Sequence, residues 1–162
     1  MNQIPGSALR PIIDHIGHII GAACKASGNP EKKGGYLCIA DHNGNVQLLM
    51  LVGEIEDSAK AEKYRQLVQE KCQRLAANPE HVSVAQSADG TVGKPAGAIR
   101  GLSSLYGFSG LPPLLDEASM LATALAAGDI DPVTIQEVIK VTNNPFAKDM
   151  LPESVFRQPS LL

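Results

Sequence analysis

"YLCIADHNGNVQLLMLVG", residues 36–53, is the stretch that decides the fold class. Two apolar runs, residues 36–41 and residues 46–53, lie on either side of the turn-forming letters HNGN. Asn43-Gly44 is the strongest short hairpin signal that a sequence offers, because both central positions of the tight turn need a positive φ. The stretch therefore predicts two antiparallel strands joined by a hairpin.

Amphipathic helices are predicted on both sides of this hairpin. Residues 9–26 place isoleucines at helical spacing on one face, and a loop of turn formers and charges follows over residues 27–35. Residues 58–77 show the same period over about five turns. A third apolar stripe runs over residues 114–125 and is closed by Gly128.

Further short strands are predicted between the second and third helices. Residues 81–86 alternate like a strand, a turn follows at Asp89-Gly90, and residues 95–101 and 103–109 have the composition of strands. This order predicts an α/β chain of the α+β type, with a largely antiparallel sheet of about five strands packed against helices. No GxGxxG motif opens a βαβ unit, which argues against a dinucleotide-binding fold.

The sequence pattern changes after Gly128, where a further helix and a proline-rich tail follow, and this predicts a C-terminal extension over residues 129–162. Asp131 caps a further helix that begins at Pro132. The tail after Pro145 is punctuated by prolines and carries the apolar residues Phe146, Met150, Leu151, Val155, Phe156, Leu161 and Leu162. A tail this apolar is expected to lie along another surface, and we predict that it contacts a neighbouring subunit in a homo-oligomer.

Length, composition and charge limit the function classes. At 162 residues the chain is long enough to bury a core without disulfides or metals. A net charge of −3 and a pI near 5.8 argue against a nucleic-acid partner, which needs clustered lysine and arginine. No apolar run of about 18 residues predicts a membrane span, and the first residues, MNQIPGSALR, lack the pattern of a signal peptide. Three cysteines without a CxxC pair favour free thiols in a reducing cytoplasm.

Lys71 is the most informative candidate for a binding site. The buried face of the helix predicted at residues 58–77 is defined by residues such as Tyr64, Val68 and Cys72. Lys71 falls close to the centre of that stripe. Such a lysine either reaches the rim with its long side chain, the ordinary case, or meets a carboxylate or an anionic ligand. In the ordinary case Lys71→Met leaves the fold intact. Tyr64 shares the face and is a second candidate ligand contact.

Arg100 and His81 are the other two candidate ligand contacts. Arg100 shares a predicted strand face with Ala96 and Ala98, whose small side chains leave room for a guanidinium to bind a carboxylate. An exposed arginine is the alternative. His81 opens the predicted strand at residues 81–86 and is the one histidine expected to be half-buried, either packed in the fold or as a ligand. No histidine spacing matches a zinc motif, so we predict no metal site.

"GFSGLPPLLDEA", residues 107–118, combines a serine-glycine turn, a proline pair and two acids. A hydrolase nucleophile elbow needs GxSxG, and here Gly110 follows Ser109 directly, so the motif is not met. The alternative is a turn from strand to helix, in which Asp116 and Glu117 lie near the positive end of the helix dipole. We interpret the stretch as a structural turn.

Four stretches follow one another in a characteristic order: IADHNGNVQLLMLVG, SAKAEKYRQLVQEKCQRLA, PAGAIRG and YGFSGLPPLLDEASMLATALA. In this order and spacing they resemble the GlcG/HbpS-like family, often called haem-degrading proteins. The resemblance covers roughly residues 8–128, so residues 1–128 are expected to form a GlcG/HbpS-like domain and residues 129–162 an extension of it.

The family pattern is matched residue by residue at three points. An Asp-x-x-Gly hairpin matches Asp41 and Gly44, and a helix carrying a lysine follows. The Ser-Gly turn matches Ser109-Gly110, and an acidic pair, here Asp116-Glu117, opens the last helix. The chain departs from the family where Gly-Gly-Val-Pro is replaced by the letters PAGA at residues 95–98.

The resemblance implies a profilin-like α/β sandwich that assembles into symmetric oligomers, and some relatives bind or degrade haem. The first hypothesis is therefore an oligomeric small-molecule-binding protein whose ligand is haem or a small carboxylate. The second is a haem-degrading or other redox enzyme, and the third is a structural or interaction module without a ligand. The candidate ligand contacts are Lys71, Arg100, His81 and Tyr64. His81 is the candidate axial ligand for haem, which we expect to bind with a Kd in the micromolar range or weaker.

Overall fold

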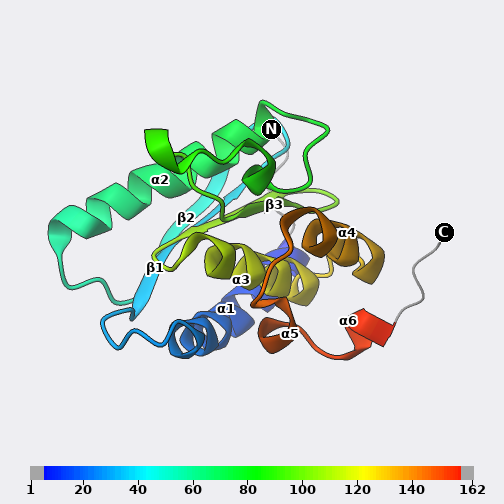
Figure 1. Ribbon diagram of the computed structural model, residues 1–162, viewed down its shortest axis with the longest axis horizontal. Helices are drawn as coiled ribbons and strands as arrows, with labels where there is room; N and C mark the ends of the chain where they lie inside the picture. Colours follow the sequence, from blue (N-terminus) through cyan, green and yellow to red (C-terminus); the bar gives the residue numbers. More distant parts are fainter. Residues whose placement is uncertain (1–5, 158–162) are drawn as a thin grey trace.

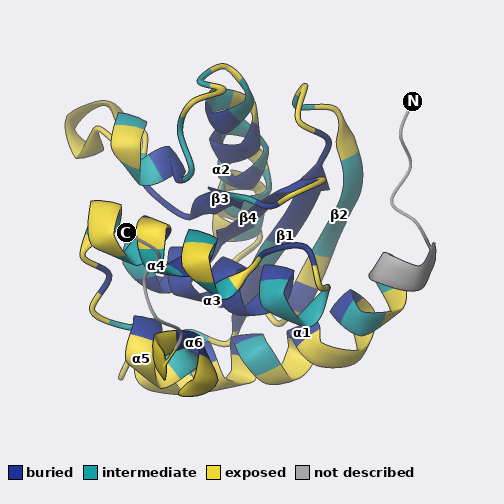
Figure 2. Cartoon of the chain, turned by 90° about the vertical axis from the view of Figure 1, so that its right-hand side faces the viewer, coloured by how far each residue is buried: buried dark blue, intermediate teal, exposed yellow. Residues whose placement is uncertain are grey.

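The computed structural model describes residues 6–157, which form a sheet between two layers of helices (Figure 1). The elements in chain order are α1 (Gly6–Ala26), β1 (Gly34–Ala40), β2 (Val46–Gly53), α2 (Ser58–Ala76), β3 (Ala98–Arg100), β4 (Leu105–Ser109), α3 (Pro113–Ala126), α4 (Pro132–Thr142), α5 (Ala147–Met150) and α6 (Ser154–Arg157). Two short 3-10 helices, η1 (Val84–Ser87) and η2 (Gly90–Val92), lie between α2 and β3. Helix α2 covers one face of the sheet, and α1 and α3 cover the other (Figures 1 and 2).

The described residues form a four-stranded sheet in the order β2-β1-β4-β3, and every neighbouring pair is antiparallel. Strand β1 pairs with β2 along its whole length, from Gly34 opposite Gly53 to Ala40 opposite Val46. The predicted α+β class with an antiparallel sheet is confirmed. The prediction of about five strands is wrong, because the described sheet has four.

The hairpin between β1 and β2 closes differently from the two-residue turn that its sequence predicts. Gly44 has a φ of +89°, whereas Asn43 keeps a negative φ. The Asp41 carboxylate accepts hydrogen bonds from the backbone N–H groups of Asn43 at 2.9 Å and Asn45 at 3.0 Å. The hairpin is therefore confirmed, but an aspartate closes a longer loop in which only one position needs glycine.

Residues 81–86 do not form a strand. Ser83 makes an isolated antiparallel bridge with Ile99, and the chain then turns into η1. A capping box explains the turn, because Ser83 Oγ accepts from the Ala85 N–H and the Gln86 side chain accepts from the Ser83 N–H. These side-chain bonds occupy backbone donors that a fifth strand would offer to the sheet.

The central strands β1 and β4 are buried from both sides (Figure 2). The core on the α2 side contains Cys38, Val68, Cys72, Leu75 and Leu105. The larger core lies on the side of α1 and α3, where Ile12, Ile16, Ile20 and Ala23 of α1 are buried as predicted. Ile13 is 54% exposed, so the buried stripe of α1 is narrower than the sequence pattern suggests.

The C-terminal segment packs on the chain's own helices. Asp131 caps α4, which begins at Pro132 as predicted. Ala147, Leu151 and Val155 are buried in the same core as residues of α1 and α3. Helix α5 contacts α1 and α3, and α6 contacts α4. The described part of the tail therefore covers the chain's own core, whereas Leu161 and Leu162 lie outside the described residues.

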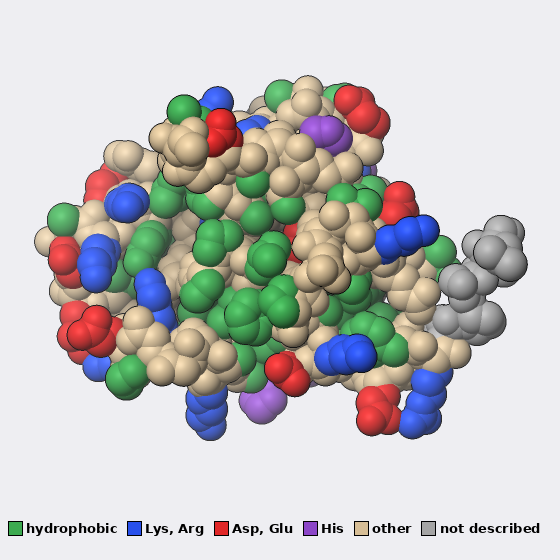
Figure 3. Space-filling model, viewed as in Figure 1, with side chains coloured by type: hydrophobic (Ala, Val, Ile, Leu, Met, Phe, Trp, Pro, Cys, Tyr) green, Lys and Arg blue, Asp and Glu red, His purple; other side chains and the backbone are tan. Residues whose placement is uncertain are grey.

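The surface combines apolar and charged areas. Figure 3 shows apolar side chains at the middle of one face, with charged side chains around them. Strand β2 lies at an edge of the sheet, and its Val46 and Leu51 are 41% and 45% exposed. None of the helices over residues 6–157 is long and apolar enough to cross a membrane.

Candidate functional site

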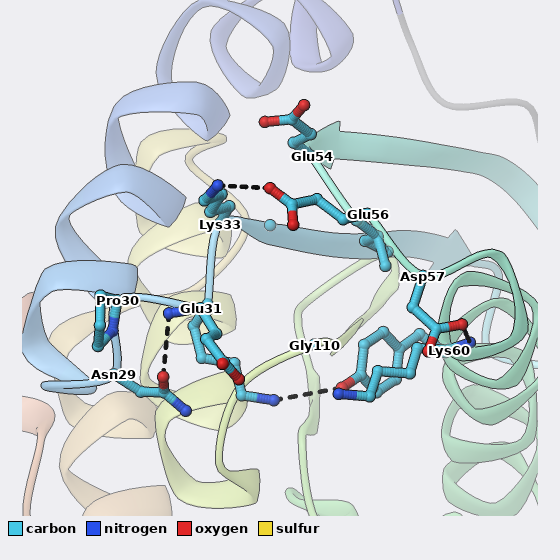
Figure 4. A pocket seen from close by; sticks show the side chains of 13 residues that line it. Asn29, Pro30, Glu31, Lys33, Glu54, Glu56, Asp57, Lys60 and Gly110 are labelled. Atoms are coloured by element: carbon cyan, nitrogen blue, oxygen red, sulfur yellow. Dashed lines mark hydrogen bonds and ion pairs between the residues drawn. The ribbon is translucent and has the colours of Figure 1, made fainter.

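A pocket of ≈ 410 Å³ opens beside the N-terminal end of α2 (Figure 4). It is lined by residues 29–33 before β1, Gly34 at the start of β1, residues 54–57 before α2, Lys60 and Tyr64 on α2, and Gly110 after β4. Charged side chains make up much of this lining. The volume is within the range of small-molecule sites, about 300–1,000 Å³.

Local hydrogen bonds shape the two loops of the pocket. Asn29 Oδ1 accepts from the Glu31 N–H at 3.0 Å, and the Asn29 carbonyl accepts from the Lys32 N–H at 3.0 Å. This turn directs the chain along the pocket into β1. On the opposite loop, the Asp57 carboxylate accepts from two N–H groups at the start of α2, at 2.8 and 3.2 Å. Asp57 therefore satisfies helix donors that could otherwise bind an anion.

Lys32 and Tyr64 meet in this pocket. Lys32 Nζ donates to Tyr64 Oη at 3.2 Å and lies 5.5 Å from the centre of the tyrosine ring. Both residues are half-buried. No carboxylate among residues 6–157 forms an ion pair with Lys32. Because an ammonium has three donors, Lys32 keeps donors for an anion that enters the pocket.

Lys33 and Glu56 form an ion pair at the rim, with Nζ 2.6 Å from Oε1. The hydrogen bond between them and the negative charge of Glu56 raise the pKa of Lys33, and the same bond and the positive charge of Lys33 lower the pKa of Glu56. Both side chains are exposed, so the pair contributes little to stability. Its consequence for the site is that two of the pocket's charges neutralise each other.

A buried ion pair binds the backbone on either side of Gly110, a residue that lines the pocket. Lys71 Nζ donates to Asp116 Oδ2 at 3.0 Å and to the Phe108 carbonyl at 2.7 Å, and the side chains of the pair are each 2% exposed. Burial raises the pKa of Asp116 to about 7, although the charge and hydrogen bond of Lys71 and the Leu111 N–H act to lower it. Lys71 does not reach the rim, so the ordinary interpretation of its position is wrong; it meets a carboxylate of its own chain.

Gly97 makes room for this ion pair. Its φ is +125°, and a Cβ atom there would lie 2.6 Å from Lys71 Nζ and 2.8 Å from Asp116 Cβ. Lys71 comes from α2 and Asp116 from α3, which cover opposite faces of the sheet (Figure 1). The pair therefore ties the two helical layers together just before β3.

Glu117 is a second buried acid, and its partners are neutral. Its Oε2 accepts from Thr142 Oγ1 at 2.8 Å and from Asn144 Nδ2 at 2.7 Å, and its Oε1 accepts from Ser83 Oγ. Burial raises the pKa of Glu117, and these hydrogen bonds act to lower it. The expected position of both acids near the start of a helix is confirmed, since α3 begins at Pro113. Their burial was not predicted.

The other two predicted ligand contacts lie away from the pocket. The Arg100 guanidinium donates to the carbonyls of Leu75 at 2.8 Å, Asn78 at 3.2 Å and His81 at 2.9 Å. It thus adds a charged donor to backbone carbonyls at the C-terminal end of α2 and in the turn that follows, where a positive charge also suits the helix dipole. His81 Nδ1 is buried and has no hydrogen-bond partner within residues 6–157.

Of the four predicted ligand contacts, only Tyr64 lines the pocket. Sequence reasoning missed Lys32, Glu31 and Lys60, because a charged loop and an exposed helix start look like solvated surface. No periodic pattern marks such residues. Only the fold brings the loop before β1 against the start of α2.

The residues of the pocket do not fit haem. Tyr64 is the one lining residue of a type that ligates haem iron, and charged loop side chains surround it instead of an apolar wall. His81, the expected axial ligand, is not part of the lining. No group of three or more histidine, cysteine, aspartate or glutamate side chains in the described part of the chain is arranged to hold a metal ion. Comparison of the chain with protein-family models, curated protein sequences and solved structures found no match.

Proposed function

We propose that this chain binds a small carboxylate ligand in the pocket beside α2. The half-buried Lys32 ammonium carries the proposal, because its hydrogen-bond partner is the neutral Tyr64 hydroxyl. The hydroxyl accepts a hydrogen bond but leaves the positive charge of the ammonium uncompensated, whereas a carboxylate supplies both an acceptor and an opposite charge, so an anion improves the environment of this ammonium. The Tyr64 hydroxyl can donate a hydrogen bond to the same carboxylate.

The fold supports a binding protein of the kind that the resemblance implies. An antiparallel sheet between helices agrees with a profilin-like sandwich, and we propose this fold and membership of the GlcG/HbpS-like family on the order of motifs given above. Haem is not the ligand that we propose, because the pocket offers charges where the macrocycle needs apolar contacts.

A binding role is favoured over catalysis by the state of Ser109. Its hydroxyl is buried and has no hydrogen-bond partner among the described residues. A nucleophilic serine needs a base within hydrogen-bond reach. Lys71 binds the carbonyl of the preceding residue and the Asp116 carboxylate, so its ammonium is committed to structural contacts.

We also propose a cytoplasmic homo-oligomer that assembles through the edge strand β2. This strand has eight residues and none is charged, whereas isolated proteins usually protect an edge with charges or proline. Its exposed Val46 and Leu51 would be covered by pairing with β2 of a second copy. The free thiols of Cys24, Cys38 and Cys72 support a reducing compartment.

Isothermal titration calorimetry with pentanoate tests the carboxylate site. We expect a Kd of about 1 mM for the wild-type protein and one about tenfold weaker for Lys32→Met. Lys63→Met is the matched control, because Lys63 is exposed on α2 and does not line the pocket. Absence of binding to the wild type, or equal binding by Lys32→Met, contradicts the proposal.

A further inference from the structure

We infer that the ligand carries an ammonium group as well as a carboxylate, as an amino acid does. The inference rests on the proposed carboxylate site and concerns the other charges of the same pocket. Lys33 and Glu56 already neutralise each other at 2.6 Å. Asp57 is held by the N–H groups at the start of α2. The charged residues of the lining that remain for a ligand are Lys32 and Lys60, which are positive, and Glu31 and Glu54, which are negative.

Two carboxylates of the pocket remain for a cationic group. Neither the Glu31 nor the Glu54 carboxylate forms an ion pair or a hydrogen bond within the part of the chain that the structure describes. Figure 4 shows Glu31 on the side of the pocket where Asn29 lies, and Glu54 turned away at the opposite rim. Glu31 is therefore the carboxylate that a ligand inside the pocket meets.

Glu31 and Lys32 follow each other in the chain but do not form an ion pair with one another. A ligand with only a carboxylate gains from Lys32, but it also brings a negative charge close to Glu31. A ligand with both groups places its carboxylate at Lys32 and its ammonium at Glu31, so that each protein group gains an opposite charge. The pocket therefore selects a zwitterion over a simple acid.

Three probes with one five-carbon skeleton separate these cases by calorimetry. Pentanoate carries the carboxylate alone, L-norvaline adds an ammonium beside it, and 5-aminopentanoate adds an ammonium at the far end. We expect at least one of the two zwitterions to bind the wild-type protein about tenfold more tightly than pentanoate. Glu31→Gln should remove that advantage, whereas Glu137→Gln, the same change at an exposed position of α4, should keep it.

The outcomes distinguish this inference from the proposed function. If pentanoate binds as tightly as both zwitterions, the inference is overturned and the carboxylate site stands. If the advantage of the zwitterion survives Glu31→Gln, the assignment to Glu31 is overturned. If none of the probes binds the wild-type protein, both the inference and the proposed function fail.

Discussion

Lys71 and Asp116 stabilise each other in a position where neither charge would be stable alone. Both side chains are almost fully buried, and the ammonium lies 3.0 Å from the carboxylate. The Phe108 carbonyl and the Leu111 N–H complete their hydrogen bonds. Removing one partner of such a pair leaves an uncompensated buried charge, whereas removing both does not.

A double-mutant cycle tests this coupling. At pH 8 we expect Lys71→Met to lower the free energy of unfolding by about 3–5 kcal/mol, because it strands the Asp116 carboxylate, and Asp116→Asn to lower it by a similar amount. The double variant should recover most of the loss, since the introduced amide is neutral and keeps an acceptor for the Leu111 N–H. Urea denaturation gives the values, and simply additive losses would show that the two residues are not coupled.

The same pair predicts a pH dependence of stability. The pKa of Asp116 in the fold is about 7, well above the ordinary aspartate value of 3.8. At pH values between 3.8 and about 7, Asp116 keeps its proton in the folded protein and has lost it in the unfolded chain. The free energy of unfolding therefore falls as pH rises through this window. Burial also raises the pKa of Glu117, which acts in the same direction.

Urea denaturation at pH 5, 6, 7 and 8 checks this dependence. The wild type should lose stability from pH 5 to pH 7, and the double variant Lys71→Met with Asp116→Asn should lose less, because the titrating group is gone. A double variant with the same slope as the wild type would contradict the role of Asp116.

At the scale of elements, periodic patterns predicted the main helices. The strand predicted at residues 81–86 does not form, because side-chain hydrogen bonds compete with sheet pairing there. The isoleucines of α1 and the apolar stripe of α3 recur at helical spacing, so a helix is the one regular structure that places most of them on a buried face. Residues 81–86 alternate like a strand, yet Ser83 and Gln86 satisfy each other's backbone groups and start a 3-10 turn. Such capping competes locally with sheet pairing, and alternation alone does not show which of the two prevails.

The tail after Pro145 was predicted to cover a neighbouring subunit, but residues 147–157 cover the chain's own core. We therefore expect Leu151→Ala to lower the free energy of unfolding by about 2–5 kcal/mol, as in other cores. Leu102→Ala, at a position that is 66% exposed, is the matched control and should have little effect. A Leu151→Ala variant as stable as wild type, with fewer subunits, would restore the original interpretation.

At the scale of the whole molecule, the pocket lies where three segments far apart in sequence converge, and this limited what could be predicted. Tyr64 was identified as a candidate ligand contact because the apolar period of α2 shows which face of the helix packs on the fold. Lys32 was not, because its place against Tyr64 depends on how β1 and α2 pack. The class of the fold follows from the hairpin and the helical stripes, whereas the site follows from tertiary contacts that no single stretch encodes.

Assembly is the second property of the whole molecule. If the edge strand β2 joins copies, Leu51→Lys should lower the subunit count, because a charge on an edge strand opposes pairing with another strand. Val133→Lys, at a 43% exposed position of α4, is the control. Light scattering after gel filtration at micromolar concentration gives the mass, and a wild-type monomer would contradict the proposed oligomer.

The central claim is that the pocket between the loop at residues 29–34 and the start of α2 binds a small carboxylate with an ammonium group. The most direct measurement is a titration of ¹⁵N-labelled protein with the two zwitterions L-norvaline and 5-aminopentanoate in turn, at least one of which should bind, followed by the backbone amide signals. The account predicts saturating shifts that concentrate at residues 29–34, residues 54–64 and Gly110. Shifts that centre on His81 and Arg100, or the absence of any shift with either zwitterion at millimolar concentration, would contradict it.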